Sequence, residues 1–157
     1  MVSVTPVRLP FFVYGTLRPG EVNHDLFLRG RVRCEEPGRL PGALLYDGPG
    51  YPYVVEEPHG GPVCGELVTA DPGEYDELLT ALDELEEYRP GDPRNLYERV
   101  AREVVRVADG TAVRAWVYVA APSVAVRLRS RGTLIGSGDW LTRRPAAPPP
   151  PPAPRMP

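Results

Sequence analysis

Phe11-Phe12-Val13-Tyr14-Gly15-Thr16-Leu17-Arg18-Pro19-Gly20 lies near the start of the chain. Its first four residues are aromatic or β-branched and predict a buried strand, which Gly15 can end with a sharp bend. Successive backbone N–H groups in such a bend can converge into a concave site for a carboxylate or an oxyanion. An ordinary turn closed by Pro19-Gly20 explains the same residues without a ligand. The segment therefore predicts a strand and a tight loop, and it leaves the role of the loop open.

The spacing of apolar side chains predicts a helix over about residues 73–88. At about 100° per residue, Tyr75, Leu78, Leu79 and Leu82 point the same way, and Glu86 falls within their stripe. Burial would raise the pKa of this carboxyl toward the range where it can both accept and donate a proton at neutral pH. Glu86 is therefore a candidate for proton transfer. The other acids of the helix are expected at the margin of the stripe or pointing away from it: Asp76, Glu77, Asp83, Glu84 and Glu87.

A purely structural role for Glu86 is also open at this stage. A side chain in the last turn of a helix can swing into solvent or pair with a nearby arginine, such as Arg89 or Arg99. A second signal is needed to choose between these roles.

Short strands are predicted before and after this helix. Their expected ranges are 10–14, 31–40, 43–46, 53–55, 63–68, 97–107 and 113–119, with a short helix ending near Leu28 and a turn at Asp109-Gly110. Many short strands with one amphipathic helix favour an α+β domain, a small, mixed and mainly antiparallel β-barrel with flanking helices.

Six segments in this order resemble the gamma-glutamylcyclotransferase-like family, in the branch of gamma-glutamylamine cyclotransferase and the small bacterial AIG2-like proteins. The resemblance covers roughly residues 10–142 and rests on Tyr14–Arg18 followed by Gly20 and Asn23, Tyr51-Pro52, Val63–Leu67, Leu82–Glu86, Tyr97–Arg99 and Ser137–Trp140. It implies a barrel with a cavity, in which the loop after the first strand holds the α-amino acid end of a substrate. It also implies that Glu86 is the acid/base.

The implied reaction is the cyclisation of a γ-glutamyl amide to 5-oxoproline with release of an amine. The residues expected to bind the substrate are Tyr14, Gly15, Thr16, Leu17 and Tyr97, and further candidates near the site are Arg18, Asn23, Ser137 and Gly138. Asn23 is expected chiefly to cap the short helix that follows it. The loop over 89–94 is expected to cover the cavity or to choose the amine half of the substrate, and the segments 43–55 and 89–96 to form the far wall of the cavity. Two alternatives stay open: hydrolysis of a γ-glutamyl bond, and a non-catalytic small-ligand-binding or regulatory protein on the same scaffold.

Composition and charge limit the other functions. The chain has 157 residues, 42% of them hydrophobic, which suits one domain, and we expect an N-terminal extension over 1–9, the domain over 10–144 and a disordered proline-rich tail over 145–157. The net charge of −3 and the absence of lysine argue against nucleic-acid binding. Arg127, Arg129 and Arg131 recur with period two, which predicts a strand or extended arm, either solvated or docking an acidic carrier protein that bears the substrate.

No cofactor or metal is expected. Cys34 and Cys64 are too few for a disulfide framework and are expected to be small buried residues, and His24 and His59 stand alone, so no metal site of familiar spacing exists. The first ten residues lack the apolar core of a signal peptide, and no run reaches membrane length. We therefore expect a cytoplasmic protein without a membrane partner.

Overall fold

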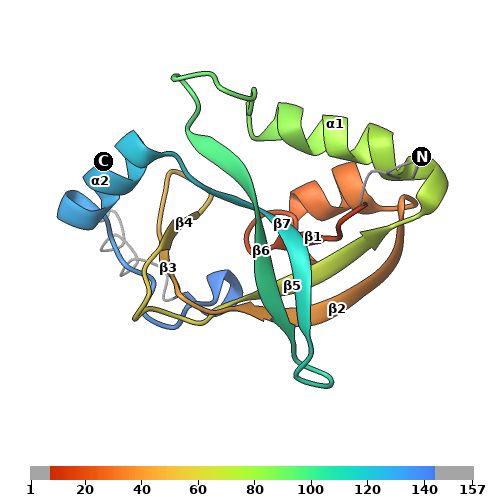
Figure 1. The fold of residues 1–157 in the computed structure, drawn as a ribbon, viewed down its shortest axis with the longest axis horizontal. Coiled ribbons are helices and arrows are strands. Elements are labelled where there is room, and N and C mark those ends of the chain that lie inside the picture. Colours follow the sequence, from red (N-terminus) through yellow and green to blue (C-terminus); the bar gives the residue numbers. More distant parts are fainter. Residues whose placement is uncertain (1–7, 144–157) are drawn as a thin grey trace, which may run out of the picture.

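Five strands close into a barrel in the computed structural model, which describes residues 8–143 (Figure 1). The proline-rich tail and all but the last two residues of the expected N-terminal extension lie outside the described residues. The barrel strands are β1 (Phe11–Val13), β2 (Val32–Leu40), β5 (Val63–Ala70), β6 (Tyr97–Arg106) and β7 (Ala112–Ala120).

The strand order around the barrel is β1-β5-β2-β6-β7. All neighbouring pairs are antiparallel except β1 with β7, which are parallel and close the barrel where Phe11 faces Trp116. The predicted small, mixed and mainly antiparallel β-barrel is therefore confirmed.

Strand β1 divides the hydrophobic core into two clusters, because successive side chains point to opposite faces of a strand. Phe12 and Tyr14 join a cluster with buried residues of β2, β5, β6 and β7, which fills the barrel interior. Phe11 and Val13 face the other way, into a cluster that includes Leu78 and Leu82 of the main helix. Strand β1 therefore lies between the barrel interior and this helix.

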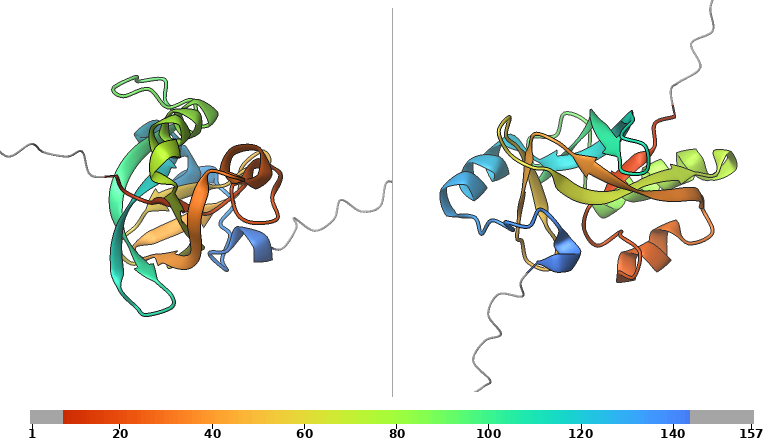
Figure 2. Two further views of the ribbon diagram at one scale, coloured as in Figure 1. Left: turned by 90° about the vertical axis from the view of Figure 1, so that its right-hand side faces the viewer. Right: turned by 90° about the horizontal axis from the view of Figure 1, so that it is seen from below.

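The main helix, α1 (Tyr75–Leu85), follows the short 3-10 helix η2 (Pro72–Glu74) and lies along one side of the barrel, near the π-helical η1 (His24–Leu28) (Figures 1 and 2). It ends three residues earlier than predicted. The N–H of Glu87 donates to the Glu84 carbonyl (3.1 Å) and the N–H of Tyr88 to the Asp83 carbonyl (2.8 Å), with Glu87 at a φ of 52°. This pair of bonds around a left-handed residue is a Schellman motif, which stops the helix.

A two-stranded ribbon of β3 (Ala43–Tyr46) and β4 (Tyr53–Glu56) lies outside the barrel, beside α2 (Pro122–Arg131) (Figures 1 and 2). The prediction that Arg127, Arg129 and Arg131 lie on a strand or extended arm is wrong, because they lie on α2. At about 100° per residue, the three side chains do not form one row on a helix, which removes the basis for a carrier-docking edge.

The cysteines differ from expectation in one respect. Both are free, but Cys34 is exposed and Cys64 is only partly buried. The first half of β2, which carries Cys34, has no fully buried side chain, because it extends past the part of the sheet that covers the core.

The last element is a short 3-10 helix, η3 (Trp140–Thr142).

Candidate active site

The loop after β1 presents free backbone donors. Its turn is closed by the N–H of Arg18, which donates to the Gly15 carbonyl (3.1 Å). Within residues 8–143, the N–H groups of Gly15, Thr16 and Leu17 donate to no protein acceptor. A Cβ on Gly15 would lie 2.7 Å from the ring of Pro52, so glycine is required for this close approach. Three successive free donors are available for an anionic group of a ligand.

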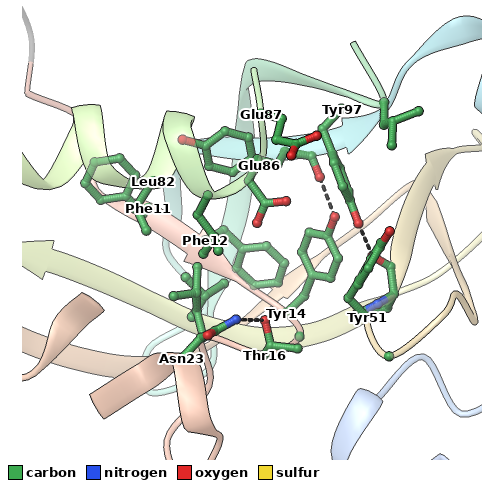
Figure 3. A pocket seen from close by; sticks show the side chains of 18 of the residues that line it. Phe11, Phe12, Tyr14, Thr16, Asn23, Tyr51, Leu82, Glu86, Glu87 and Tyr97 are labelled. Atoms are coloured by element: carbon green, nitrogen blue, oxygen red, sulfur yellow. Dashed lines mark hydrogen bonds between the residues drawn. The ribbon is translucent and has the colours of Figure 1, made fainter. Parts of the chain in front are cut away.

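The side chain of Thr16 is held by Asn23, whose Nδ2 donates to Thr16 Oγ1 (2.9 Å; Figure 3). Asn23 stands at the N-cap position of η1, but its side chain makes no capping hydrogen bond, so the expected capping role is wrong. Since Oγ1 accepts from Asn23, the hydroxyl proton of Thr16 is free to be donated to a ligand.

Arg18 braces the loop from behind. Its guanidinium binds Glu66 through two hydrogen bonds of 2.8 Å and also binds Asp139. Arg18 is buried, and it does not line the cavity described below. Ser137 and Gly138 also lie away from that cavity: the Ser137 hydroxyl bonds the backbone of Asp139, and the Gly138 carbonyl accepts from the N–H of Cys64 (2.7 Å). These three residues therefore support the site from outside.

Glu86 is the C-cap residue of α1, and its carboxylate is partly buried without any protein partner among the described residues. Arg99, one of its expected partners, binds Asp83 instead (2.9 Å). No side-chain oxygen within residues 8–143 is both fully buried and unpaired, so the oxygens of Glu86 must be open to the cavity. Burial raises the pKa of Glu86 to about 7, from an ordinary value of 4.5. At neutral pH this carboxyl can both accept and donate a proton.

Three tyrosines surround Glu86 as neutral phenols. The Tyr14 hydroxyl donates to the Tyr118 carbonyl, the Tyr97 hydroxyl to the Pro52 carbonyl (2.8 Å), and the Tyr118 hydroxyl to Asp83 (2.6 Å). Burial raises the pKa of each phenol, and the Glu86 charge raises it further. Tyr14 and Tyr97 thus donate their hydroxyl protons to backbone carbonyls, and each phenol oxygen can still accept a hydrogen bond from a ligand.

One cavity of about 390 Å³ joins these features, and we call it the Glu86 cavity. A volume of this order is typical of small-molecule sites. Figure 3 shows Glu86 pointing into it, with Thr16 and Asn23 on one side and Glu87 and Tyr97 on the other. The sequence-predicted site residues that line it are Tyr14, Gly15, Thr16, Leu17, Asn23, Glu86 and Tyr97.

The far wall only partly follows the sequence-based expectation. Gly50, Tyr51 and Pro52 contribute from the first expected segment, but β3 does not line the cavity. From the second segment only Leu96 reaches it, while Arg89, Asp92, Arg94 and Asn95 line a separate, more open hollow on the outer side of α1. The expectation that the loop over 89–94 covers the cavity is therefore wrong, because Asn95 holds that loop outward through two hydrogen bonds to the backbone of Arg89 (2.7 and 3.0 Å).

Among the polar side chains that line the cavity, sequence reasoning missed two, Glu87 and Tyr118. Helical periodicity predicted that Glu87 points away from the stripe that contains Glu86. In the structure the left-handed backbone of Glu87 ends the helix, and Glu87 lines the cavity. The sequence around Glu87 does not indicate a Schellman motif, because this motif usually has glycine at the position of Glu87. Tyr118 could have been found from its strand, where it alternates with the barrel-facing Val117 and Val119.

Two general findings concern the described residues only. No three of their His, Cys, Asp or Glu side chains are grouped so that they could hold a metal ion. None of their helices has the length and apolar character needed to cross a lipid bilayer.

Known proteins are similar to this chain in sequence and fold. The model of the family described as gamma-glutamyl cyclotransferase, AIG2-like matches residues 11–142. A candidate gamma-glutamylcyclotransferase of Halalkalibacterium halodurans is 43% identical over 116 residues, which are 73% of this chain and 91% of that protein. The gamma-L-glutamyl-butirosin B gamma-glutamyl cyclotransferase of Niallia circulans is 38% identical over 109 residues, which are 69% of this chain but only 64% of that enzyme.

The crystal structure of a mouse AIG2-like protein has the same fold. It superimposes with a TM-score of 0.56 at 26% sequence identity, covering 73% of this chain and 80% of the mouse protein. The match of the family model over nearly all described residues, together with the two curated relatives, decides the classification. The chain belongs to the gamma-glutamyl cyclotransferase, AIG2-like family, and it is an enzyme of the gamma-glutamylcyclotransferase-like type.

Proposed function

We propose that this protein converts a γ-glutamyl amide into 5-oxoproline and a free amine. The α-amine of the glutamyl group attacks its own γ-carbonyl carbon, a C–N bond forms to close a five-membered lactam, and the original amide C–N bond breaks. In passing from ammonium to lactam N–H the attacking nitrogen loses two protons, and the departing nitrogen gains two and leaves as an ammonium, so no water, cofactor or oxidant is consumed. Because the attack is intramolecular, holding the substrate in a folded conformation supplies several kcal/mol of the acceleration.

The observation that carries this proposal is the unpaired carboxyl of Glu86 in the same cavity as the free donors of the loop after β1. The reaction needs one group that takes a proton from the substrate ammonium and then gives it to the leaving nitrogen. A carboxyl with a pKa of about 7 is suited to both steps at neutral pH. A carboxylate held in an ion pair would be a poor acceptor, and Glu86 has no such pair within residues 8–143.

The N–H groups of Gly15, Thr16 and Leu17, with the Thr16 hydroxyl, hold an anionic part of the substrate. Either the α-carboxylate or the oxyanion that develops on the γ-carbonyl meets this requirement. A substrate analogue without the α-carboxylate separates the two: Gly15→Ala, which pushes the loop against Pro52, should raise KM for the glutamyl substrate but not for the analogue if the carboxylate is the bound group.

Product analysis tests the proposed function. The protein is incubated with a panel of γ-glutamyl amides, and 5-oxoproline and glutamate are quantified by mass spectrometry. Release of 5-oxoproline supports the cyclotransferase, and release of glutamate shows a γ-glutamyl hydrolase instead. If no amide in the panel is converted although one binds, the protein is a ligand-binding module on this scaffold.

The Glu86→Gln variant tests the role of the acid. We expect turnover to fall at least about 100-fold, the usual contribution of a general acid/base, with binding of the substrate retained. Glu84→Gln, which changes an exposed acid of the same helix outside the cavity, is the matched control and should keep its rate. A Glu86→Gln enzyme with the wild-type rate refutes the assignment.

A further inference from the structure

Two of the sequence segments singled out above, Leu82–Glu86 and Tyr97–Arg99, meet outside the Glu86 cavity. The Nε of Arg99 donates to Oδ1 of Asp83 (2.9 Å), and the same oxygen accepts from the Tyr118 hydroxyl (2.6 Å). Arg99 and Tyr118 are partners across the β6–β7 ladder. Neither Asp83 nor Arg99 lines the cavity. The proposed reaction therefore gives no direct task to either side chain.

Asp83 ties the last turn of α1 to the barrel. It precedes Glu86 by three residues, and residues with this spacing are neighbours on a helix surface. Within residues 8–143, side chains of α1 form hydrogen bonds to the rest of the domain at two places. At the first turn the Tyr75 hydroxyl donates to the Leu9 carbonyl (2.7 Å), and at the last turn Asp83 bonds to β6 and β7. The end of α1 that carries Glu86 is thus fixed by Asp83.

Arg99 also contacts the segment that follows Glu86. Its guanidinium carbon lies 5.5 Å from the ring centroid of Tyr88 and 4.3 Å from that of Trp116, distances at which a cation is attracted to an aromatic face. Tyr88 comes two residues after Glu86, and its N–H donates to the Asp83 carbonyl (2.8 Å). One guanidinium therefore contacts the chain on both sides of Glu86.

The Glu86 carboxyl has no such contact of its own. Within residues 8–143 it forms no hydrogen bond or ion pair. The other titratable side chains that line the cavity are four phenols and one carboxyl, with no cation among them: Tyr14, Tyr51, Tyr97, Tyr118 and Glu87. The backbone that carries Glu86 thus sets its position. This position matters, because a displacement of about 1 Å in a reacting group can cost on the order of 100-fold in rate.

We propose that Arg99 is a positioning residue for Glu86 and that it acts through Asp83 and Tyr88. This inference rests on the proposed function, and it deepens it by naming the residues that hold the acid at the reacting atoms. Arg99 itself does not touch the substrate. Its planar guanidinium can bond a carboxylate and lie against aromatic rings at the same time, which the ammonium of a lysine does not do.

Steady-state kinetics on an amide that the wild type converts test this proposal. Arg99→Met should lower kcat by about 10- to 100-fold. KM should change little, because the free donors expected to hold the substrate lie on the loop after β1. Arg99→Lys, which keeps the charge but not the planar group, should recover kcat only in part.

A double variant guards against poor folding. Arg99→Met leaves Asp83 without its cation, which can destabilise the protein, whereas Arg99→Met combined with Asp83→Asn leaves no unpaired charge. The double variant should have nearly the kcat of Arg99→Met, since both side chains act through one contact. Arg102→Met is the matched control. Arg102 lies on the same strand, binds Glu56 (2.9 Å) away from the cavity, and should be replaceable without loss of kcat.

An NMR titration of the Glu86 carboxyl, assigned by comparison with Glu86→Gln, provides a readout that needs no turnover. A displaced Glu86 regains water, so the pKa of Glu86 should fall from about 7 toward its ordinary value of 4.5 in the double variant. The acid limb of kcat/KM should move to lower pH in the same way. A merely structural role of Arg99 would lower the Tm and leave this pKa unchanged.

The proposal is overturned if the double variant keeps either the wild-type kcat or the wild-type pKa of Glu86. It is also overturned if Arg102→Met lowers kcat as much as Arg99→Met does. If the wild type converts no γ-glutamyl amide, the proposed function has failed, which is a different result. The titration then still decides whether Arg99 positions Glu86.

Discussion

Replacing Glu86 by glutamine should stabilise this protein, and the gain should grow with pH. In the folded protein the pKa of Glu86 is raised by burial from 4.5 to about 7. The native state therefore binds this proton more tightly than the unfolded chain, and stability falls as the pH rises from about 4.5 to about 7. Below that window both states are protonated, and no penalty exists.

The size of the effect follows from the pKa shift. A tenfold change in proton affinity is worth about 1.4 kcal/mol, so the raised pKa of Glu86 lowers the free energy of unfolding by about 3 kcal/mol at pH 8.5, where both states are ionised, and by about 1 kcal/mol at pH 5, where mainly the unfolded chain is ionised. Glutamine has nearly the same shape and does not ionise. The free energy of unfolding of Glu86→Gln should therefore exceed that of the wild type by about 2.5 kcal/mol more at pH 8.5 than at pH 5.

Urea denaturation followed by circular dichroism at the two pH values measures this difference. Glu84→Gln provides the control, because an exposed substitution should change stability by less than about 0.5 kcal/mol at either pH. If the gap between Glu86→Gln and the wild type is the same at pH 5 and pH 8.5, Glu86 is not held in a desolvated site. The reasoning that makes it the acid/base is then refuted.

Three further predictions concern the rest of the site. Below about pH 7, kcat/KM for a γ-glutamyl amide should fall about tenfold per pH unit, because protonated Glu86 cannot take the substrate's proton; a flat profile from pH 5 to pH 7 contradicts this. Arg18→Met should lower the free energy of unfolding by about 3–5 kcal/mol in urea denaturation, since it leaves two partly buried carboxylates without their cation, and a loss below about 1 kcal/mol would show that the network is unimportant. Asn23→Ala should raise KM several-fold and change kcat little in steady-state kinetics, because it releases the Thr16 hydroxyl; an unchanged KM argues against that role.

The elements that form the barrel were predictable because their patterns are local. Strand β1 reads as an aromatic run ended by glycine, and the apolar stripe of α1 is clear from Leu78 and Leu82. The same stripe indicated that Glu86 turns inward. These patterns work because the period of the side chains alone decides which face is buried.

Other features could not be predicted, because they depend on contacts between residues that no local sequence pattern indicates. The alternating arginines of α2 have the period of a strand, and the competing helical signal is short: Val124 and Ala125 precede the arginines, and Leu128 lies between two of them. Glu87 was misplaced because a single left-handed residue reverses the direction predicted from helical spacing. The bonds of Asn23 to Thr16 and of Arg18 to Asp139 join separate turns, and such pairings emerge only in three dimensions.

The ion pair between Arg18 and Asp139 also determines when the site can be completed during synthesis of the protein. The two partners are separated by 121 positions in the sequence, and Trp140 adds a bond to Glu21 (2.8 Å) across almost the same interval. On the ribosome, the loop at Gly15 therefore has only the bonds of Arg18 to Glu66 and of Asn23 to Thr16 until the final segment of the domain has emerged. A nascent chain released before Asp139 should accumulate with an incompletely supported active site, however completely its barrel strands have paired.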